Sequence, residues 1–506
     1  MRWFLAVLGL TLCLGCRSSQ KTAARGEPTL RLAVVTDLKG HLEPCGCTSD
    51  PLGGIDRLAA QIKTLRDADA PLVVLLVGDT FFDAAPLDSA RVDQANRNAQ
   101  TLVRILNRLG ITAVLPGARD REQPSKALET LRAASEFPWL AMEDTTTVLI
   151  DEAGDHAVGI VGARPGTKGH ALEAAVETAS ERAELVLVLV DGSRRDANRS
   201  GAIGRVDFVI QGGLDQDEAM PPRRAGNAWV LHASRQGQGL TVVDVHRRRN
   251  DETFADRSEW SRTERAAQLD RQIEELHAKI TEWAKSGDID PTDLEAQRAR
   301  LVGLRKKRGL VGAEATTDDG NSFSARWVEL RKKSPSDREV AALMQEHDKV
   351  VNEANRLAFA DLEPPPLGPN DVAYVGSAAC SGCHQTAYAW WRNHSHGVAY
   401  LTLQQRSKEY NLDCVGCHVT GYQQPGGSTV THNLDGQLRN VGCESCHGPG
   451  ALHLKDPETA IVRVPPEATC TVCHNQQHSD LFDYEAYMKT LVVPGHGLPE
   501  SAGEPL

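Results

Sequence analysis

The strongest constraint in this sequence is a five-residue pattern, Cys-x-x-Cys-His, that occurs four times between residues 380 and 474. In each copy two thiols stand three positions apart, and a histidine follows the second thiol directly. The four copies are Cys380, Cys383 and His384; Cys414, Cys417 and His418; Cys443, Cys446 and His447; and Cys470, Cys473 and His474. Eight of the 12 cysteines belong to these copies, so the last quarter of the chain must fold around them.

This spacing has a direct chemical reason. Two thiols three positions apart can add to the two vinyl groups of one haem, and the next residue then carries its imidazole under the iron as the proximal ligand. A zinc ribbon uses Cys-x-x-Cys pairs but has no use for a histidine after each pair. Disulfides would leave four identically placed histidines unexplained. We therefore expect four covalently attached c-type haems.

The intervals between the motifs predict how these haems pack. Successive motifs begin 34, 29 and 27 residues apart, which is too little chain to bury each macrocycle separately. The haems must then form the core of this region and lie near one another. An aromatic content of only 5% agrees with this expectation, because the porphyrins would supply the flat apolar mass.

Each iron has a second axial position, and the sequence offers candidate ligands for it. Six histidines besides the four proximal ones lie between residues 371 and 506: His394, His396, His432, His453, His478 and His496. This surplus favours bis-histidine ligation of most haems, the low-potential state of electron carriers.

Three segments resemble the tetrahaem cytochrome c-554 family. The run from Cys443 to His453, Cys-Glu-Ser-Cys-His-Gly-Pro-Gly-Ala-Leu-His, is similar to a signature in which the last histidine is a distal ligand. The run Trp-Arg-Asn-His-Ser-His-Gly-Val-Ala from Trp391 resembles a segment whose register selects His396 rather than His394.

The closing segment of the family is similar to Phe482–Gly497, which implies His496 as a third distal ligand. For the remaining haem His432 and His478 compete, with His432 as our assignment, or that iron keeps an open position.

The N-terminal half has the pattern of a domain different from the haem-binding region. Apolar strands at Leu30–Thr36, Leu72–Val77 and Leu185–Val190 each precede an aspartate and alternate with amphipathic helices, which predicts a layered α/β fold. The order of segments over residues 28–248 resembles the periplasmic 5′-nucleotidases, a branch of the calcineurin-like metallophosphoesterases. That resemblance implies a β-sandwich flanked by helices.

The metal ligands of that family are mostly missing. Two-metal phosphoester hydrolysis needs carboxylates, imidazoles and an amide around both ions. Asp37 and Asp79 match, but Lys39 stands in place of the first histidine, Ala118 in place of the bridging asparagine and Arg119 in place of the catalytic histidine. We expect the domain to be non-hydrolytic. The alternative is that the protein is a 5′-nucleotidase or other phosphoesterase with an attached cytochrome domain.

Two further cysteines lie in the N-terminal half, in the run Glu43-Pro44-Cys45-Gly46-Cys47. The plain interpretation is a structural disulfide or two buried thiols. A Cys-x-Cys ring is strained, so such a disulfide would be unusually reducible. Cys45 and Cys47 are therefore candidate redox or metal-binding thiols.

The chain begins like an exported protein. A basic start and an apolar run that is too short to span a bilayer suit a secretory signal, and the run ends at Cys16 after Gly15 as in bacterial lipoproteins. We expect an exported protein that is either periplasmic or tethered to a membrane by a lipid at Cys16. For a tethered protein, we expect the outer membrane rather than the inner one. Ordinary cleavage that leaves the protein free is the alternative.

The expected organisation is multidomain. A heptad stripe from Leu269 to Trp283, followed by a helix start at Asp290, predicts a helical hairpin. The expected parts are a signal peptide at 1–16, a 5′-nucleotidase-like α/β domain at 28–248, a helical connector at 261–360, a Pro-rich linker at 361–370 and a mostly helical or irregular multihaem cytochrome domain at 371–506.

Charge narrows the choice of partners. The chain has 56 Lys and Arg against 68 Asp and Glu, which argues against a general nucleic-acid binder. Residues 371–506 have 7 Lys and Arg against 13 Asp and Glu, which favours basic redox partner proteins. The sequence thus predicts an electron relay, with a multihaem oxidoreductase that acts on a small nitrogen, sulfur or oxygen species at a five-coordinate haem as the alternative. The oligomeric state is not predicted.

Overall fold

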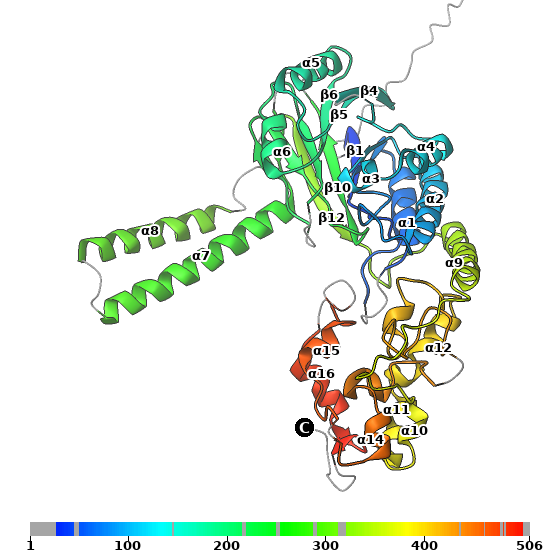
Figure 1. Ribbon diagram of the computed structural model, residues 1–506. Coiled ribbons are helices and arrows are strands. Elements are labelled where there is room, and N and C mark those ends of the chain that lie inside the picture. Colours follow the sequence, from blue (N-terminus) through cyan, green and yellow to red (C-terminus); the bar gives the residue numbers. More distant parts are fainter. Residues whose placement is uncertain are drawn as a thin grey trace, which may run out of the picture.

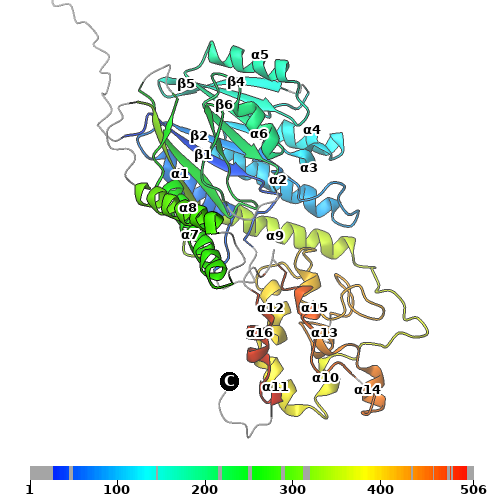
Figure 2. The ribbon, with the colours of Figure 1, turned by 90° about the vertical axis from the view of Figure 1, so that its left-hand side faces the viewer.

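The computed structural model describes residues 27–44, 50–143, 146–214, 219–248, 253–286, 291–311, 320–434, 437–459, 461–475, 479 and 482–498. A layered α/β body carries a long helical hairpin that projects to one side, and a smaller region rich in short helices lies against the other end (Figure 1). Helix α9, Arg338–Ala358, runs between the body and this smaller region (Figure 2).

Six strands form the first sheet, in the order β11-β12-β10-β1-β2-β3. β1 and β2 pair in parallel, as do β2 and β3, whereas β10 is antiparallel to both β1 and β12. Their bounds are Leu30–Thr36 (β1), Leu72–Gly78 (β2), Ala113–Pro116 (β3), Gly239–His246 (β10), Ala255–Asp256 (β11) and Ser322–Glu329 (β12).

The second sheet also has six strands, in the order β4-β5-β6-β7-β9-β8. Parallel pairing runs through β5, β6, β7 and β9, and the two outer strands are antiparallel to their neighbours. The bounds are Thr146–Ala153 (β4), His156–Ala163 (β5), Leu185–Asp191 (β6), Phe208–Gly212 (β7), Arg223–Ala225 (β8) and Ala228–Leu231 (β9).

The two sheets pack face to face, because successive side chains of a strand point to opposite faces. In β2, Leu75 and Val77 contribute to a core that the first sheet shares with the second, where Ile160 and Leu189 join it. Leu76 points the other way, into a core with two covering helices.

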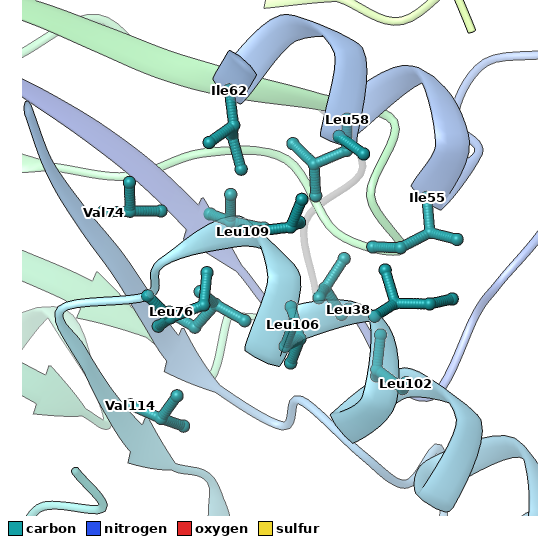
Figure 3. Close-up of a cluster of buried hydrophobic side chains, with 14 of the residues drawn as sticks. Leu38, Ile55, Leu58, Ile62, Val74, Leu76, Leu102, Leu106, Leu109 and Val114 are labelled. Carbon is teal, nitrogen blue, oxygen red and sulfur yellow. The ribbon is translucent and has the colours of Figure 1, made fainter. Parts of the chain in front are cut away.

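Helices cover both outer faces. Figure 3 shows Leu58 and Ile62 of α1 and Leu102 of α2 gathered over Val74 and Leu76 of β2. α5 and α6 pack on the second sheet. The helix bounds are Ile55–Arg66 (α1), Val92–Leu109 (α2), Ala118–Arg121 (α3), Ser125–Ala134 (α4), Gly169–Ser180 (α5) and Arg194–Gly201 (α6). The expected β-sandwich flanked by helices is confirmed.

The middle of the chain is helical, as expected. α7, Glu259–Ser286, and α8, Pro291–Leu310, pack along a seam of Leu276, Ile280 and Leu301. The region from 261 to 360 also contains β12, which pairs with β10 along its whole length. Alternating burial explains this strand, because Phe323 and Ala325 point into the core between the sheets. The first sheet therefore extends past residue 248.

The side chain of Asp337 caps the N-terminus of α9. The Asp337 carboxylate accepts the backbone N–H groups of Glu339 and Val340, both at 3.0 Å. Val340 and Met344 pack into the core around α1 and α2, so α9 belongs to the α/β body.

The C-terminal region has short helices and few buried side chains. Its main apolar cluster is formed by Tyr400, Val415, Val419, Val430 and Leu434. The helix bounds are Ser377–Cys380 (α10), Gln385–Asn393 (α11), Ser395–Val398 (η1), Ala399–Gln404 (α12), Val415–Cys417 (η2), Cys443–His447 (α13), Ala451–Lys455 (α14), Glu467–Thr471 (α15) and Tyr484–Leu491 (α16). Two short strands, Val493–Pro494 (β13) and Gly497–Leu498 (β14), pair close to the end. Among the described residues, no helix combines the length and apolar character that a membrane span requires.

Candidate functional site

Each Cys-x-x-Cys-His motif folds as a short helical turn. The backbone N–H of His384 donates to the carbonyl of Cys380 at 2.9 Å, and the N–H of His474 donates to Cys470 at 2.8 Å. The third motif is the helix α13 itself. A turn of this kind brings residues three and four apart onto one side, so both thiols and the imidazole can face one group.

The fold brings the four motifs together in pairs. The thiol of Cys380 contacts that of Cys443, which joins the first motif to the third. The thiol of Cys417 contacts a cysteine of the fourth motif, Cys473. Helices α13 and α15, which carry cysteines of the third and fourth motifs, also contact each other, so the four motifs form one cluster, as their short intervals along the chain predict.

Three of the motif histidines each lie opposite one distal candidate. The ring centres of His384 and His453 are 6.3 Å apart. Those of His447 and His496 are 6.3 Å apart, and those of His474 and His396 are 6.2 Å apart. Residues from 49 to 78 positions apart in the chain thus meet at nearly the same separation.

This separation is the one that a shared metal ion requires. A bond between a metal and an imidazole nitrogen is about 2 Å long, and the ring centre lies about 1 Å behind that nitrogen, so two imidazoles on one metal have centres about 6 Å apart. The three pairs fit this value. The residues present therefore fit an iron between each pair of rings.

Backbone carbonyls lie within hydrogen-bond distance of Nδ1 in several of these rings. Nδ1 of His447 lies 2.6 Å from the carbonyl of Val462, and Nδ1 of His496 lies 2.7 Å from that of Leu491. The Nδ1 of His453 is 3.0 Å from the Thr459 carbonyl. A ring that donates from Nδ1 keeps the lone pair on Nε2, which is the arrangement of metal-binding histidines.

Burial keeps the ring of the distal candidate His396 neutral. The pKa of His396 falls to about 4 because the ring is buried and because His394, His474 and His418 add positive charge nearby. A neutral imidazole at pH 7 is the form that can bind a metal.

His418 is the proximal candidate of the second motif. Its Nδ1 lies 2.7 Å from the carbonyl of Ala399, so this ring is oriented like the others. The ring of His432 is not placed against it in the described part of the chain, and the backbone of His432 instead bonds Thr429. His478 lies outside the described residues. His394 stacks on Trp390 with ring centres 4.6 Å apart.

Two residues of this site were not singled out from the sequence. Trp390 stacks on His496 with ring centres 4.5 Å apart and 2° between the planes, so it fixes a distal candidate. The buried carboxylate of Glu444 accepts the N–H groups of Gly376 and Gly450, each at 2.7 Å, and that of Val375 at 3.0 Å. Its position between the two cysteines of the third motif was the available signal.

The aspartates of the N-terminal half converge at the carboxyl ends of three strands. Asp37 follows β1, Asp79 follows β2, and Asp191 ends β6; all three are buried. A Cβ at Gly78 would lie 2.2 Å from Oδ1 of Asp37, so only glycine fits between them. Burial raises the pKa of Asp37 to about 7, and the charges of Asp79 and Asp191 add to the rise.

Arginines neutralise two of these carboxylates. Nη1 of Arg119 lies 2.8 Å from Oδ2 of Asp79, and the Arg119 backbone N–H donates to the other oxygen at 2.8 Å. Nη2 of Arg121 lies 2.9 Å from the Asp191 carboxylate. Among the described residues no group of three or more His, Cys, Asp or Glu side chains could hold a metal ion. Lys39, at the position of the first missing histidine, is itself buried.

Cys16, Cys45 and Cys47 lie outside the described residues, and their roles stay sequence predictions.

Comparison with known proteins identifies the C-terminal region. The family of cytochrome c554 and c-prime matches residues 379–448. Cytochrome c-554 of Nitrosomonas europaea is 37% identical over 95 residues, which cover 16% of this chain and 40% of that protein. The C-type polyheme cytochrome OmcB of Geobacter sulfurreducens is 26% identical over 136 residues, covering 25% of this chain and 17% of that protein. The chain thus spans less than half the length of these curated relatives.

The α/β body resembles a solved 5′-nucleotidase and a solved thiohydrolase in fold. A 5′-nucleotidase precursor from Thermus thermophilus has a TM-score of 0.42 at 13% identity, covering 82% of this chain and 72% of that one. The sulfate thiohydrolase SoxB of the same species has a TM-score of 0.42 at 14% identity, covering 72% and 68%. At these scores the likeness carries no conclusion about substrate or activity. The sequence match and the paired histidines lead to one identification: the C-terminal region of this chain is a cytochrome c554 domain, which binds c-type haems.

Proposed function

We propose that this protein relays electrons through four covalently bound haems. The observation that carries the proposal is the set of three histidine pairs with ring centres 6.2 to 6.3 Å apart, each joining a motif histidine to a distal one. In this proposal His384 pairs with His453, His447 with His496, and His474 with His396. Haems held by two histidines are coordinatively saturated, so they exchange electrons without binding substrate.

His418 would hold the fourth iron. His432, the distal ligand that the sequence suggests for it, remains part of the proposal without support from the ring positions. The clustered motifs would keep all four irons close enough for electrons to pass along the domain. Electrons would enter and leave through basic partner proteins, because residues 371–506 have an excess of acidic side chains.

Electron paramagnetic resonance of the ferric protein separates the relay from its alternative. Four low-spin irons would support a relay without a substrate site. Three low-spin irons and one high-spin iron would instead support an oxidoreductase that binds a small nitrogen, sulfur or oxygen species at the iron on His418.

The α/β body would be non-hydrolytic in this proposal. The guanidinium group of Arg119 bonds to Asp79, one of the two carboxylates that match the metal ligands, and that of Arg121 bonds to the nearby Asp191. The test is a nucleotide-hydrolysis assay with added Mn²⁺ or Mg²⁺, and metal-dependent turnover would restore the phosphoesterase alternative.

On the sequence alone, Cys45 and Cys47 would exchange electrons with the haems. Oxidation of the two thiols to a disulfide releases two electrons and two protons, and two ferric haems would each take one electron while the protons pass to solvent. Unchanged haem reduction by dithiols after replacement of both cysteines by serine would refute this role.

Proteins of the cytochrome c554 family are extracytoplasmic. Lipidation at Cys16 would tether this protein to a membrane, and the outer membrane is favoured over the inner one. Cell fractionation tests this placement: Cys16→Ser is expected to move the protein from the membrane fraction to the soluble periplasmic fraction.

A further inference from the structure

A lysine is buried where the α/β body meets the second haem-binding motif. Lys408 lies six residues before Cys414 and is only 8% exposed. Its ammonium bonds to the carboxylate of Glu43, in the loop after β1, and lies 3.5 Å from that of Asp348 on α9. One charged group of the cytochrome domain is thus enclosed by two carboxylates of the α/β body.

The segment that carries Lys408 is fixed to the body along its length. Gln94 of α2, itself buried, donates to Asn411 at 3.1 Å and to Asp413 at 2.8 Å, and accepts the Leu412 N–H at 3.0 Å. Arg91 forms an ion pair with Asp413 at 2.5 Å.

α9 binds the same segment from its other side. Asn352 accepts the backbone N–H of Tyr410 at 2.9 Å, and Asn355 donates to the Tyr410 carbonyl at 2.9 Å. The position of Lys408 relative to Cys414 and Cys417 is therefore set by α2 and α9.

The surroundings keep this lysine charged. Burial by itself lowers the pKa of Lys408, but the charges of Glu43 and Asp348 outweigh burial, so that the pKa is raised overall. Two backbone hydrogen bonds join Lys408 to the second motif: the N–H of Asn411 donates to the carbonyl of Lys408 at 3.0 Å, and the N–H of Cys414 donates to that of Asn411 at 3.0 Å.

We propose that Lys408 is a positioning residue for the haem bound at Cys414 and Cys417. The reduction potential of that haem depends on the contact of Lys408 with Glu43 and Asp348 of the α/β body. This inference rests on the proposed relay and adds a role for the α/β body in it. A positive charge near a haem favours the ferrous state, which has gained an electron, and a negative charge favours the ferric state. Changes on either side of the contact must then move one potential in opposite directions.

The experiment is a spectroelectrochemical titration of the full-length haem-loaded protein. Lys408→Met is expected to lower the midpoint potential of one of the four one-electron steps, and Glu43→Gln is expected to raise that same step. A tenfold change in the ratio of ferrous to ferric haem at fixed potential corresponds to about 59 mV for one electron.

Two matched variants serve as controls. Glu353→Gln removes a carboxylate from the exposed face of the same helix α9, where it pairs with Arg356, and is expected to shift no step. Lys408→Arg keeps the charge. In this variant the step that Lys408→Met lowers is expected to keep its wild-type midpoint potential, which a purely structural role would not predict.

The outcomes separate the failure of this inference from the failure of the relay. Four loaded haems whose potentials are the same in wild type, Glu43→Gln and Lys408→Met would overturn the role of Lys408 and leave the relay standing. A wild-type protein without haem would overturn the relay itself. If Lys408→Met fails to fold, Glu43→Gln and Lys408→Arg carry the test, because an unshifted step in Glu43→Gln is already contradictory.

Discussion

The centres of the imidazole rings of His384 and His453 lie 6.3 Å apart with 23° between their planes, although the two residues are 69 positions apart in the chain. Their spacing equals that of His447 with His496, and His474 with His396 lies within 0.1 Å of it. The distal candidates come from three different local structures: α14, the turn that follows α16, and η1. The repetition of one spacing on unrelated local structures is what a common axial bond length would produce.

Removal of one distal ring should change one iron. In His453→Ala we expect one of the low-spin ferric signals to become high-spin, because the iron on His384 loses its second strong ligand. Electron paramagnetic resonance at low temperature measures the change. His277→Ala is the control, since His277 is exposed on α7, in the helical hairpin; a spin change in this control would refute the assigned pairing.

The buried carboxylate of Glu444 should stabilise the cytochrome domain. It accepts three backbone N–H groups that join α13 to residues 375–376 and 450. Glu444→Gln replaces one acceptor oxygen by a donor that faces N–H groups, and we expect the free energy of unfolding to fall by about 1–3 kcal/mol. Urea unfolding of the haem-loaded protein measures this loss. The exposed Glu467→Gln should leave stability unchanged, and equal effects of the two variants would contradict the structure.

The ion pair of Arg119 and Asp79 should hold the α/β body together in place of a metal. Arg119→Met leaves a buried carboxylate without its guanidinium, and we expect a loss of about 1–3 kcal/mol in unfolding free energy. The double variant with Asp79→Asn should recover part of that loss, because the uncompensated charge is gone. Denaturant titration compares the three proteins; an equal loss in single and double variants would contradict this role.

The contact of α9 with α2 should weaken in acid through His347. Its ring lies 2.9 Å from the Thr101 hydroxyl and 3.0 Å from Asn98, and its pKa is lowered to about 4 by burial first and by the charge of Lys408 second. Arg104 and Arg97 lower this pKa further, and Glu43 opposes them.

The sign of the pH dependence follows from these values. Between pH 4 and the ordinary histidine value near 6.5, the unfolded chain binds the proton that the folded chain excludes, so stability falls as pH falls, by up to about 3 kcal/mol. Thermal unfolding from pH 7 to pH 4 measures this loss. His347→Gln, which cannot titrate, should show a smaller loss over the same window, and parallel curves would show that His347 is not responsible.

Much of the fold could be predicted from local patterns. The strands that precede Asp37, Asp79 and Asp191 are continuous apolar runs, and the seam of Leu276 and Ile280 follows a heptad. β12 was not predicted, because its alternation of Ser, Phe, Ser and Ala is short and follows a helical region. Only its pairing with β10 shows that it belongs to the first sheet.

The candidate site divides in the same way. The chemistry of the motifs is local, so the sequence indicates the proximal histidines, whereas the pairing of each distal ring depends on long-range packing. The contact of Lys408 with Glu43 and Asp348 could not be predicted from the sequence, because the two carboxylates are far from Lys408 in the chain. Each of the three residues taken alone has the pattern of a solvent-exposed charge.

The most direct measurement is a pyridine haemochrome assay of the mature protein, combined with its protein concentration and made in a host that can attach haem. We predict four c-type haems per chain, one for each Cys-x-x-Cys-His motif. A colourless protein, or one that binds zinc at these cysteines instead, would contradict the relay and every role assigned to the paired histidines.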